Sequence, residues 1–206
     1  MDELPLYRGE VLESLRVPLE AGRVRIARSA GAVSYPSRFS LIAAMNPCPC
    51  GYSGDSERSC RCKEGRLEGY RSKLSGPFID RMDLGIMLSR LTRRELMGPP
   101  EGDSSEVIRA RVEAARTLQS ERWGPSLTNS SVPTGRLRKG VALTDSARAE
   151  MGDAIEGLAL TGRGVDRLLR VARTIADLSG SAEVTVEHLG HALGFRLQGV
   201  DAVMAA

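Results

Sequence analysis

A short apolar run that ends in an asparagine constrains the fold of this chain more than any other feature. Residues 39–45 read Phe-Ser-Leu-Ile-Ala-Ala-Met and lead into Asn46-Pro-Cys-Pro-Cys-Gly51. A nearly continuous apolar run of this length is typical of a strand covered on both faces, as in a parallel sheet. The run at 83–88, Asp-Leu-Gly-Ile-Met-Leu, predicts a second buried strand. We therefore expect an α/β region with Asn46 at the carboxyl edge, where open α/β sheets bind ligands.

The rest of the chain shows mainly helical spacing of apolar residues. Helices are predicted over 4–21 (bent or ended near its last turn by Pro18), 67–74, 106–122, 145–158, 163–178 and from 186 onward. Pro, Gly and Ser punctuate 97–105, which predicts a linker whose Ser104 or Ser105 caps the next helix. The expected organisation is an α/β part over 1–96, a linker over 97–105, an all-helical domain over 106–197 and a frayed tail over 198–206.

Composition narrows the function only slightly. The 206 residues carry 29 basic and 26 acidic side chains, a balance too even to indicate a nucleic-acid partner by itself. No apolar run approaches the roughly 20 residues that span a bilayer, and the first residues lack a signal-peptide pattern. We expect a cytoplasmic protein with no membrane partner.

The four cysteines lie within fifteen positions, as Cys48-Pro-Cys50 and Cys60-Arg-Cys62. In a reducing compartment such a cluster is more often a metal site than a pair of disulfides. Four thiolates enclose a tetrahedral Zn²⁺ completely, which is the pattern of a structural site. The Cys-x-Cys spacing is tighter than the usual two-residue gap, so free thiols on a flexible loop remain the alternative.

A hairpin is predicted between the first helix and the Asn46 strand. Val24 and Ile26 alternate with Arg23 and Arg25, a small-residue turn follows, and 33–38 forms the second arm. One face is expected to carry Arg23 and Arg25, with Arg28 as a further member, as candidate DNA contacts.

Three further features are ambiguous when each is taken alone. Asp2 and Glu3 before a helix are typical of a cap, and Asn46 before Pro47 is typical of a turn. Arg81, at the end of Ser75-Gly-Pro-Phe-Ile-Asp-Arg81, could stabilise charge on a phosphoryl group. The competing interpretation is a simple salt bridge to Asp80 or Asp83.

An arginine face completes the list of candidates. Arg163, Arg167 and Arg170 lie at i, i+4 and i+7 on one predicted helix. Such a face meets a triphosphate, a nucleic-acid backbone or only water.

The order of these motifs resembles the magnesium-chelatase-like AAA+ ATPases of the YifB/ComM type. The most similar stretches are 43–51, 75–83 and 171–178. The resemblance implies the C-terminal half of a P-loop ATPase core, an incomplete parallel sheet, followed by a helical lid. It also implies ATP and Mg²⁺ as cofactors, a hexameric ring as the assembly, and DNA as the partner in branch migration during natural transformation.

The resemblance also implies residue roles. Asp2 and Glu3 match the end of the Walker B segment, where Asp supports Mg²⁺ and Glu polarises the attacking water. Asn46 matches sensor 1, and Arg81 matches the arginine finger that acts on a neighbouring subunit's ATP. Arg163 matches sensor 2 of the lid, with Arg167 as the alternative.

The sequence departs from the family at one point, because it contains no Gly-x-x-x-x-Gly-Lys-Ser/Thr phosphate loop. We therefore expect a fragment that does not hydrolyse ATP alone. Two other interpretations stay open: a zinc-stabilised nucleic-acid- or protein-binding module without catalysis, and a chelatase subunit acting in metal insertion.

Overall fold

The computed structural model describes residues 1–29, 31–55, 57–99 and 102–196. The chain divides into two compact units, the first taking in Met1–Met82 and the second beginning at Asp83. The expected tail over 198–206 lies outside the described residues. Within the described part, no helix combines the length and the apolar character that crossing a membrane requires.

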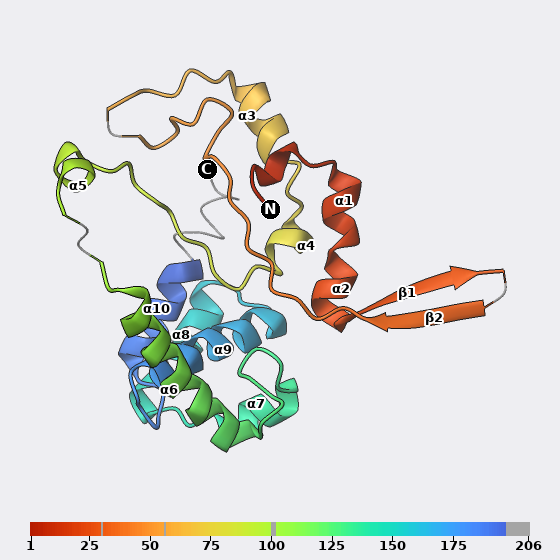
Figure 1. Cartoon of the computed structure of the whole chain (residues 1–206), viewed down its shortest axis with the longest axis vertical. Helices are drawn as coiled ribbons and strands as arrows, with labels where there is room; N and C mark the ends of the chain where they lie inside the picture. Colours follow the sequence, from red (N-terminus) through yellow and green to blue (C-terminus); the bar gives the residue numbers. More distant parts are fainter. Residues whose placement is uncertain (30, 56, 100–101, 197–206) are drawn as a thin grey trace. The chain divides into compact units, whose positions relative to one another are not determined.

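The first unit is built from short helices and one hairpin (Figure 1). Its elements are η1 (Leu4–Leu6), α1 (Gly9–Ser14), α2 (Arg16–Ala21), β1 (Arg23–Arg28), β2 (Gly31–Pro36), α3 (Glu64–Arg71) and α4 (Gly76–Ile79). Its small core consists of Leu4, Leu12, Leu74, Phe78 and Ile79. Phe78 and Ile79 are buried because α4, capped by the Ser75 hydroxyl, turns them inward.

The helix predicted over 4–21 is broken into three pieces. The break at Leu15 places Pro18 in the first turn of α2. A proline is tolerated there because the first-turn N–H groups have no intrahelical acceptor. The structure therefore has, in place of a bend at Pro18, a break at Leu15, after which the new helix α2 begins before the proline.

The predicted hairpin is confirmed. β1 and β2 pair antiparallel with Arg23 opposite Pro36 and Arg28 opposite Gly31. The ribbon projects from the end of α2, and its residues are exposed except for the partly buried Val24 (Figure 1).

The expected incomplete parallel sheet is wrong for this structure. The hairpin is the sheet found in the described residues, and the runs at 39–45 and 83–88 form no strand. An isolated strand is not stable in water, because its backbone groups need neighbouring strands as partners. Only the end of the first run has such partners, as described below.

The second unit is helical, as predicted. It contains α5 (Arg93–Met97), α6 (Ser105–Trp123), α7 (Thr134–Gly140), α8 (Asp145–Gly157), α9 (Gly162–Leu178) and α10 (Val186–Phe195). Side-chain caps begin four of them, since Thr92, Ser104, Thr144 and Thr161 accept hydrogen bonds from the N–H groups of their first turns. Helix α9 is central and packs against α6, α7 and α10.

The core of this unit lies around α9. Leu168, Ala172 and Ala176 are buried on that helix, and Trp123 of α6 is 3% exposed. A polar network is enclosed beside them, where Asp177 accepts hydrogen bonds from Arg122, Arg173 and Asn129. Arg173 is 0% exposed.

Candidate metal centre and sensor hollow

The four cysteines converge on one point in the first unit. Their Sγ atoms all lie within 4.8 Å of one another. The Sγ–Sγ distances are 3.4 Å for Cys48–Cys50, 3.7 Å for Cys50–Cys60 and 3.6 Å for Cys48–Cys60. A tetrahedron with Zn–S bonds of about 2.3 Å has edges of about 3.8 Å. The thiols therefore fit a tetrahedral thiolate site, and the cluster could hold a metal such as zinc.

Local backbone turns bring the sulfurs together. Gly51 and Gly54 adopt left-handed conformations with φ of 82° and 79°. The turn after Cys50 lets the N–H of Ser53 donate to Cys48 Sγ at 3.3 Å, and the N–H of Cys62 donates to Cys60 Sγ at 3.5 Å. Donors of this kind favour charged sulfur, which is the form that binds metal.

The thiol pKa values diverge within the cluster. The backbone N–H groups of Arg61 and then Tyr52 lower the pKa of Cys50 to about 6. Burial, followed by the Cys50 sulfur, raises the pKa of Cys62 to about 12. Sulfurs this close repel one another when ionised, so full ionisation requires a cation at the centre.

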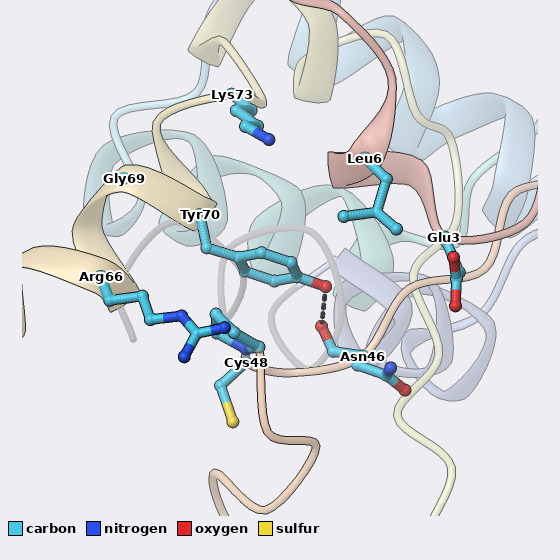
Figure 2. Close-up of a pocket in the computed structure, with 9 residues that line it drawn as sticks. Glu3, Leu6, Asn46, Cys48, Arg66, Gly69, Tyr70 and Lys73 are labelled. Carbon is cyan, nitrogen blue, oxygen red and sulfur yellow. Dashed lines mark hydrogen bonds between the residues drawn. The ribbon is translucent and has the colours of Figure 1, made fainter. Parts of the chain in front are cut away.

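A hollow of about 490 Å³ lies beside the cysteine loop (Figure 2). Its lining consists of Glu3, Leu6, Asn46, Cys48, Pro49, Arg66, Gly69, Tyr70 and Lys73. A smaller hollow of about 210 Å³ is lined by Asp2, Glu3, Leu6 and Tyr7. The structure thus brings Glu3 and Asn46 into one lining, with Asp2 on the adjoining surface.

Backbone pairing explains this meeting of distant residues. Ala44 donates its N–H to Met1 O at 2.9 Å and accepts from Leu4 N at 3.0 Å, and the Met1 ammonium donates to Ile42 O at 2.6 Å. Met1 bonding to residues on both sides of Ala43 is the pattern of a parallel pair. Glu3 leaves that pairing in a left-handed conformation, with φ of 49°, at the edge where Asn46 follows Ala44.

Tyr70 is a site residue that sequence reasoning missed. Its hydroxyl donates to the backbone oxygen of Asn46 at 3.0 Å (Figure 2). Burial, followed by Cys48, raises the pKa of Tyr70. The available signal was the spacing of Arg66 and Tyr70 at i and i+4, which places these two polar side chains on one face of α3.

Arg81 is held within the first unit. It forms an ion pair with Glu20 at 2.5 Å and donates to Pro77 O, and its side chain is 11% exposed. The competing partners expected from sequence were Asp80 and Asp83, but the structure selects Glu20 of α2. Arg81 does not line the hollow that contains Asn46.

The lid arginines belong to the second unit. Arg163 lies in the first turn of α9, and Arg167 Nε is 3.5 Å from Asp83 Oδ1. Arg170, on the same predicted face, donates to the carbonyl oxygens of Asn129 and Val132. Arg170 therefore stabilises a loop, which leaves Arg163 and Arg167 as candidates for ligand contact.

The hairpin arginines divide between two faces. Side chains alternate along a strand, so Arg23 and Arg25 share one face of β1 while Arg28 shares the other with Val24 and Ile26. The expectation that Arg28 joins the same face is wrong.

Both parts of the chain match the magnesium chelatase families. Residues 1–96 match the family "Magnesium chelatase, subunit ChlI", and residues 102–196 match "Magnesium chelatase, subunit ChlI C-terminal". The class of protein is therefore that of the magnesium-chelatase-like proteins, with the ChlI-type part followed by its C-terminal helical domain.

Comparison with individual relatives shows which group of magnesium-chelatase-like proteins includes this chain. The chain is 37% identical to competence protein ComM of Haemophilus influenzae and 35% identical to the uncharacterised protein YifB of Escherichia coli, each over 95% of this chain and 38% of the relative. An uncharacterised protein of Mycobacterium tuberculosis is 38% identical over 97% of this chain and 39% of its own length. The chain belongs to the magnesium-chelatase-like family, in the group that includes ComM and YifB. It spans about two fifths of the length of these relatives.

Proposed function

We propose that this chain supplies the water-activating and sensing part of an ATP-driven AAA+ motor that assembles as a ring and acts on DNA. The observation that supports this proposal most directly is that Glu3 and Asn46 line one hollow, where the backbone pairing of Met1 and Leu4 with Ala44 ends. In this proposal Glu3 polarises a water, Asn46 orients it, and Asp2 supports Mg²⁺. A carboxylate and an amide at one edge suit these tasks, since both supply oxygen to a hard cation or to water.

The arginines have complementary roles in the same proposal. Arg81 acts on the nucleotide of a neighbouring subunit, where a guanidinium stabilises charge on the transferring phosphoryl group. Arg163 or Arg167 contacts the nucleotide from the lid. ATP binding itself requires a phosphate loop, which this sequence does not contain. We therefore propose that the 206-residue chain alone has no ATP turnover.

A chimera tests the assignment. Residues 1–196 replace the matching part of Haemophilus influenzae ComM, and ATP hydrolysis is measured by phosphate release. We expect turnover that Glu3→Gln and Arg81→Ala each abolish. Mixing the two inactive variants is expected to restore part of the activity, because a ring then pairs an intact Glu3 with an intact Arg81 from a neighbour.

The controls separate these roles from folding. Arg148→Ala, an exposed arginine of α8, is expected to keep full turnover. Turnover that survives Glu3→Gln, or a mixture that stays inactive, would contradict the proposed division of the site between subunits.

We further propose that the cysteine cluster binds one structural Zn²⁺ through Cys48, Cys50, Cys60 and Cys62. All four positions around the metal are then protein ligands, so the ion supplies loop order and no open coordination site. The purified chain is expected to release one zinc per molecule to a colorimetric chelator after thiol modification. Cys48→Ser is expected to lower that value sharply, and an unchanged zinc content would contradict the site.

A second candidate function is a zinc-stabilised DNA-binding module without catalysis. The observation that favours it is the projecting ribbon with Arg23 and Arg25 on one face. Binding to a labelled duplex should weaken with salt, and Arg23→Gln with Arg25→Gln should reduce both the affinity and the salt slope. Arg28→Gln, on the opposite face, is the matched control. An affinity that the double change leaves intact would remove the ribbon as a DNA contact.

A further inference from the structure

Helix α3 connects the cysteine cluster to the asparagine of the hollow. Cys62 is separated from the first residue of α3, Glu64, only by the N-cap residue Lys63. The same helix carries Tyr70, whose hydroxyl donates to Asn46 O at 3.0 Å across 24 residues of sequence. A cation held by Cys62 would therefore fix the start of the helix that presents Tyr70.

A second connection runs along the chain itself. Asn46 is separated from Cys48 only by Pro47, whose ring fixes its own φ. Cys48 is 0% exposed and lies in the same lining as Asn46 and Tyr70. On the other side, Ala44 is held by its pairing with Met1 and Leu4.

These connections form a closed path. It runs from Asn46 through Cys48 to the sulfur cluster, then through Cys62 and α3 to Tyr70, and returns to Asn46 by the hydrogen bond (Figure 2). A closed path restrains its members more than either connection alone, because the carbonyl plane of Asn46 is held by Tyr70 while its neighbours are held by Cys48 and Ala44. The direction of the Asn46 side chain depends on that plane.

We propose that Tyr70 is a positioning residue that couples metal binding at the cysteine cluster to the orientation of Asn46. The inference rests on the proposed zinc site and adds a consequence to it. Zinc binding orders Asn46 only while the Tyr70 hydroxyl is present. Without the metal, the four thiols separate, α3 loses its fixed start, and Tyr70 holds Asn46 less firmly.

The sequence offers a clean probe, because Asn46 and Asn129 are the two asparagines of the whole chain. Labelling asparagine with ¹⁵N gives one reporter in the hollow and one in the buried network of the second unit. The heteronuclear NOE of each backbone amide measures order on the ps–ns timescale, with zinc and after chelation. This readout does not respond merely to the proximity of the ion.

The expected result differs between substitutions of two tyrosines, Tyr70 and Tyr52. In the wild-type chain, zinc raises the NOE of Asn46 and leaves Asn129 unchanged. Tyr70→Phe binds the same one equivalent of zinc but loses the rise at Asn46. Tyr52→Phe is the matched control, since it removes a hydroxyl inside the cysteine loop that pairs with Arg58 and not with Asn46.

Two kinds of failure are distinguishable. If zinc binds and Asn46 does not respond, or responds equally in Tyr70→Phe, the coupling is overturned and the metal site stands. If the chain binds no zinc, both the metal site and the coupling are overturned. Equal loss in Tyr52→Phe would also overturn the coupling, because it would show a general loosening of the loop.

Discussion

Asp177 is the residue on which the polar interior of the second unit depends. Its carboxylate accepts from Arg122 at 2.7 Å, from Asn129 at 2.7 Å and from Arg173 at 3.1 Å. Asp177→Asn removes the charge while keeping the shape, so the buried Arg173 keeps its carbonyl acceptors, Ser181 and Ala182, but loses its counter-charge. We expect a loss of about 3–5 kcal/mol in the free energy of unfolding.

Urea unfolding followed by the emission of Trp123, the single tryptophan, measures this loss in the second unit. The matched control is Asp103→Asn, which removes the Asp103–Arg111 pair, where both side chains are more than half exposed. We expect less than about 1 kcal/mol there. Equal effects of the two changes would show that burial is not what makes Asp177 important.

Gly140 illustrates how packing reverses a helix propensity. A Cβ at this position would lie 2.5 Å from Cζ3 of the buried Trp123 ring, whereas a Cβ at Gly135 of the same helix would meet open space. Glycine to alanine normally favours a helix by up to about 1 kcal/mol. We therefore expect Gly135→Ala to be neutral or stabilising and Gly140→Ala to cost about 1–3 kcal/mol. Thermal unfolding measured by far-UV circular dichroism compares the two, and the opposite order would contradict the close contact.

At the scale of elements, α10 begins with a pH-sensitive cap. His188 Nδ1 accepts from the N–H of Thr185 at 3.1 Å, and Nε2 lies 2.9 Å from Ser179 Oγ. Burial, followed by Arg173, lowers the pKa of His188. The neutral ring is thus favoured in the fold. Its stabilisation is present above the unfolded pKa of about 6.5 and is lost as the pH falls toward the folded value.

Urea unfolding of the second unit between pH 7.5 and 5 tests this cap. We expect stability to fall on acidification below about pH 6.5. His188→Gln should flatten that dependence, because glutamine completes the same capping box without titrating. His191→Gln is the control and should keep the slope. If the dependence of stability on pH disappears only in His191→Gln, the titrating group is His191 and not His188.

The contrast between elements shows how far the sequence determines them. Helices α6, α8, α9 and α10 of the second unit were predictable because periodic apolar residues and Ser or Thr caps agree locally, whereas the short helices α5 and α7 were not predicted. The hairpin was predictable from alternation. The strands predicted at 39–45 and 83–88 are absent, because a strand depends on partners elsewhere in a sheet, and the sequence of the run itself does not contain them.

The candidate sites divide in the same way. The four cysteines were predictable because metal ligands are few in kind and close in sequence. The link between Glu3 and Asn46 could be predicted only from the family resemblance, because 42 residues of chain lie between them and their proximity depends on the Ala44 pairing. Tyr70 was missed, since a tyrosine on a polar helix has no distinctive pattern. The burial of Arg173 was missed because its acceptors beyond Asp177 are the carbonyl oxygens of Ser181 and Ala182, in the segment after α9.

At the scale of the whole chain, the two units differ in what holds them together. The second has a continuous core around Trp123, Leu168 and Leu189, while the first relies on a small cluster around Leu12 and Phe78 and on a loop with four free thiols. We expect two unfolding transitions, with amides in 39–45 exchanging faster than those of α9.

Zinc is expected to change only one of the two transitions. A ligand that binds the folded state raises stability by RT ln(1 + [L]/Kd), so zinc should shift the first unit and leave the Trp123-reported transition in place. Hydrogen exchange measured by mass spectrometry, with zinc and after chelation, reports the stability of each unit separately. Exchange in 39–45 as slow as in α9 without zinc would contradict this difference.

The neck of the β1–β2 ribbon has a consequence for how this protein can be altered. Ser37 N–H donates to Gly22 O at 2.8 Å, so the chain leaves α2 and returns to nearly the same point. The segment between Gly22 and Ser37 can therefore be removed without moving these two residues, because they are already hydrogen-bonded to each other. The ribbon can therefore be shortened, exchanged or deleted as a cassette, and the rest of the first unit keeps its own contacts while whatever the ribbon binds is lost.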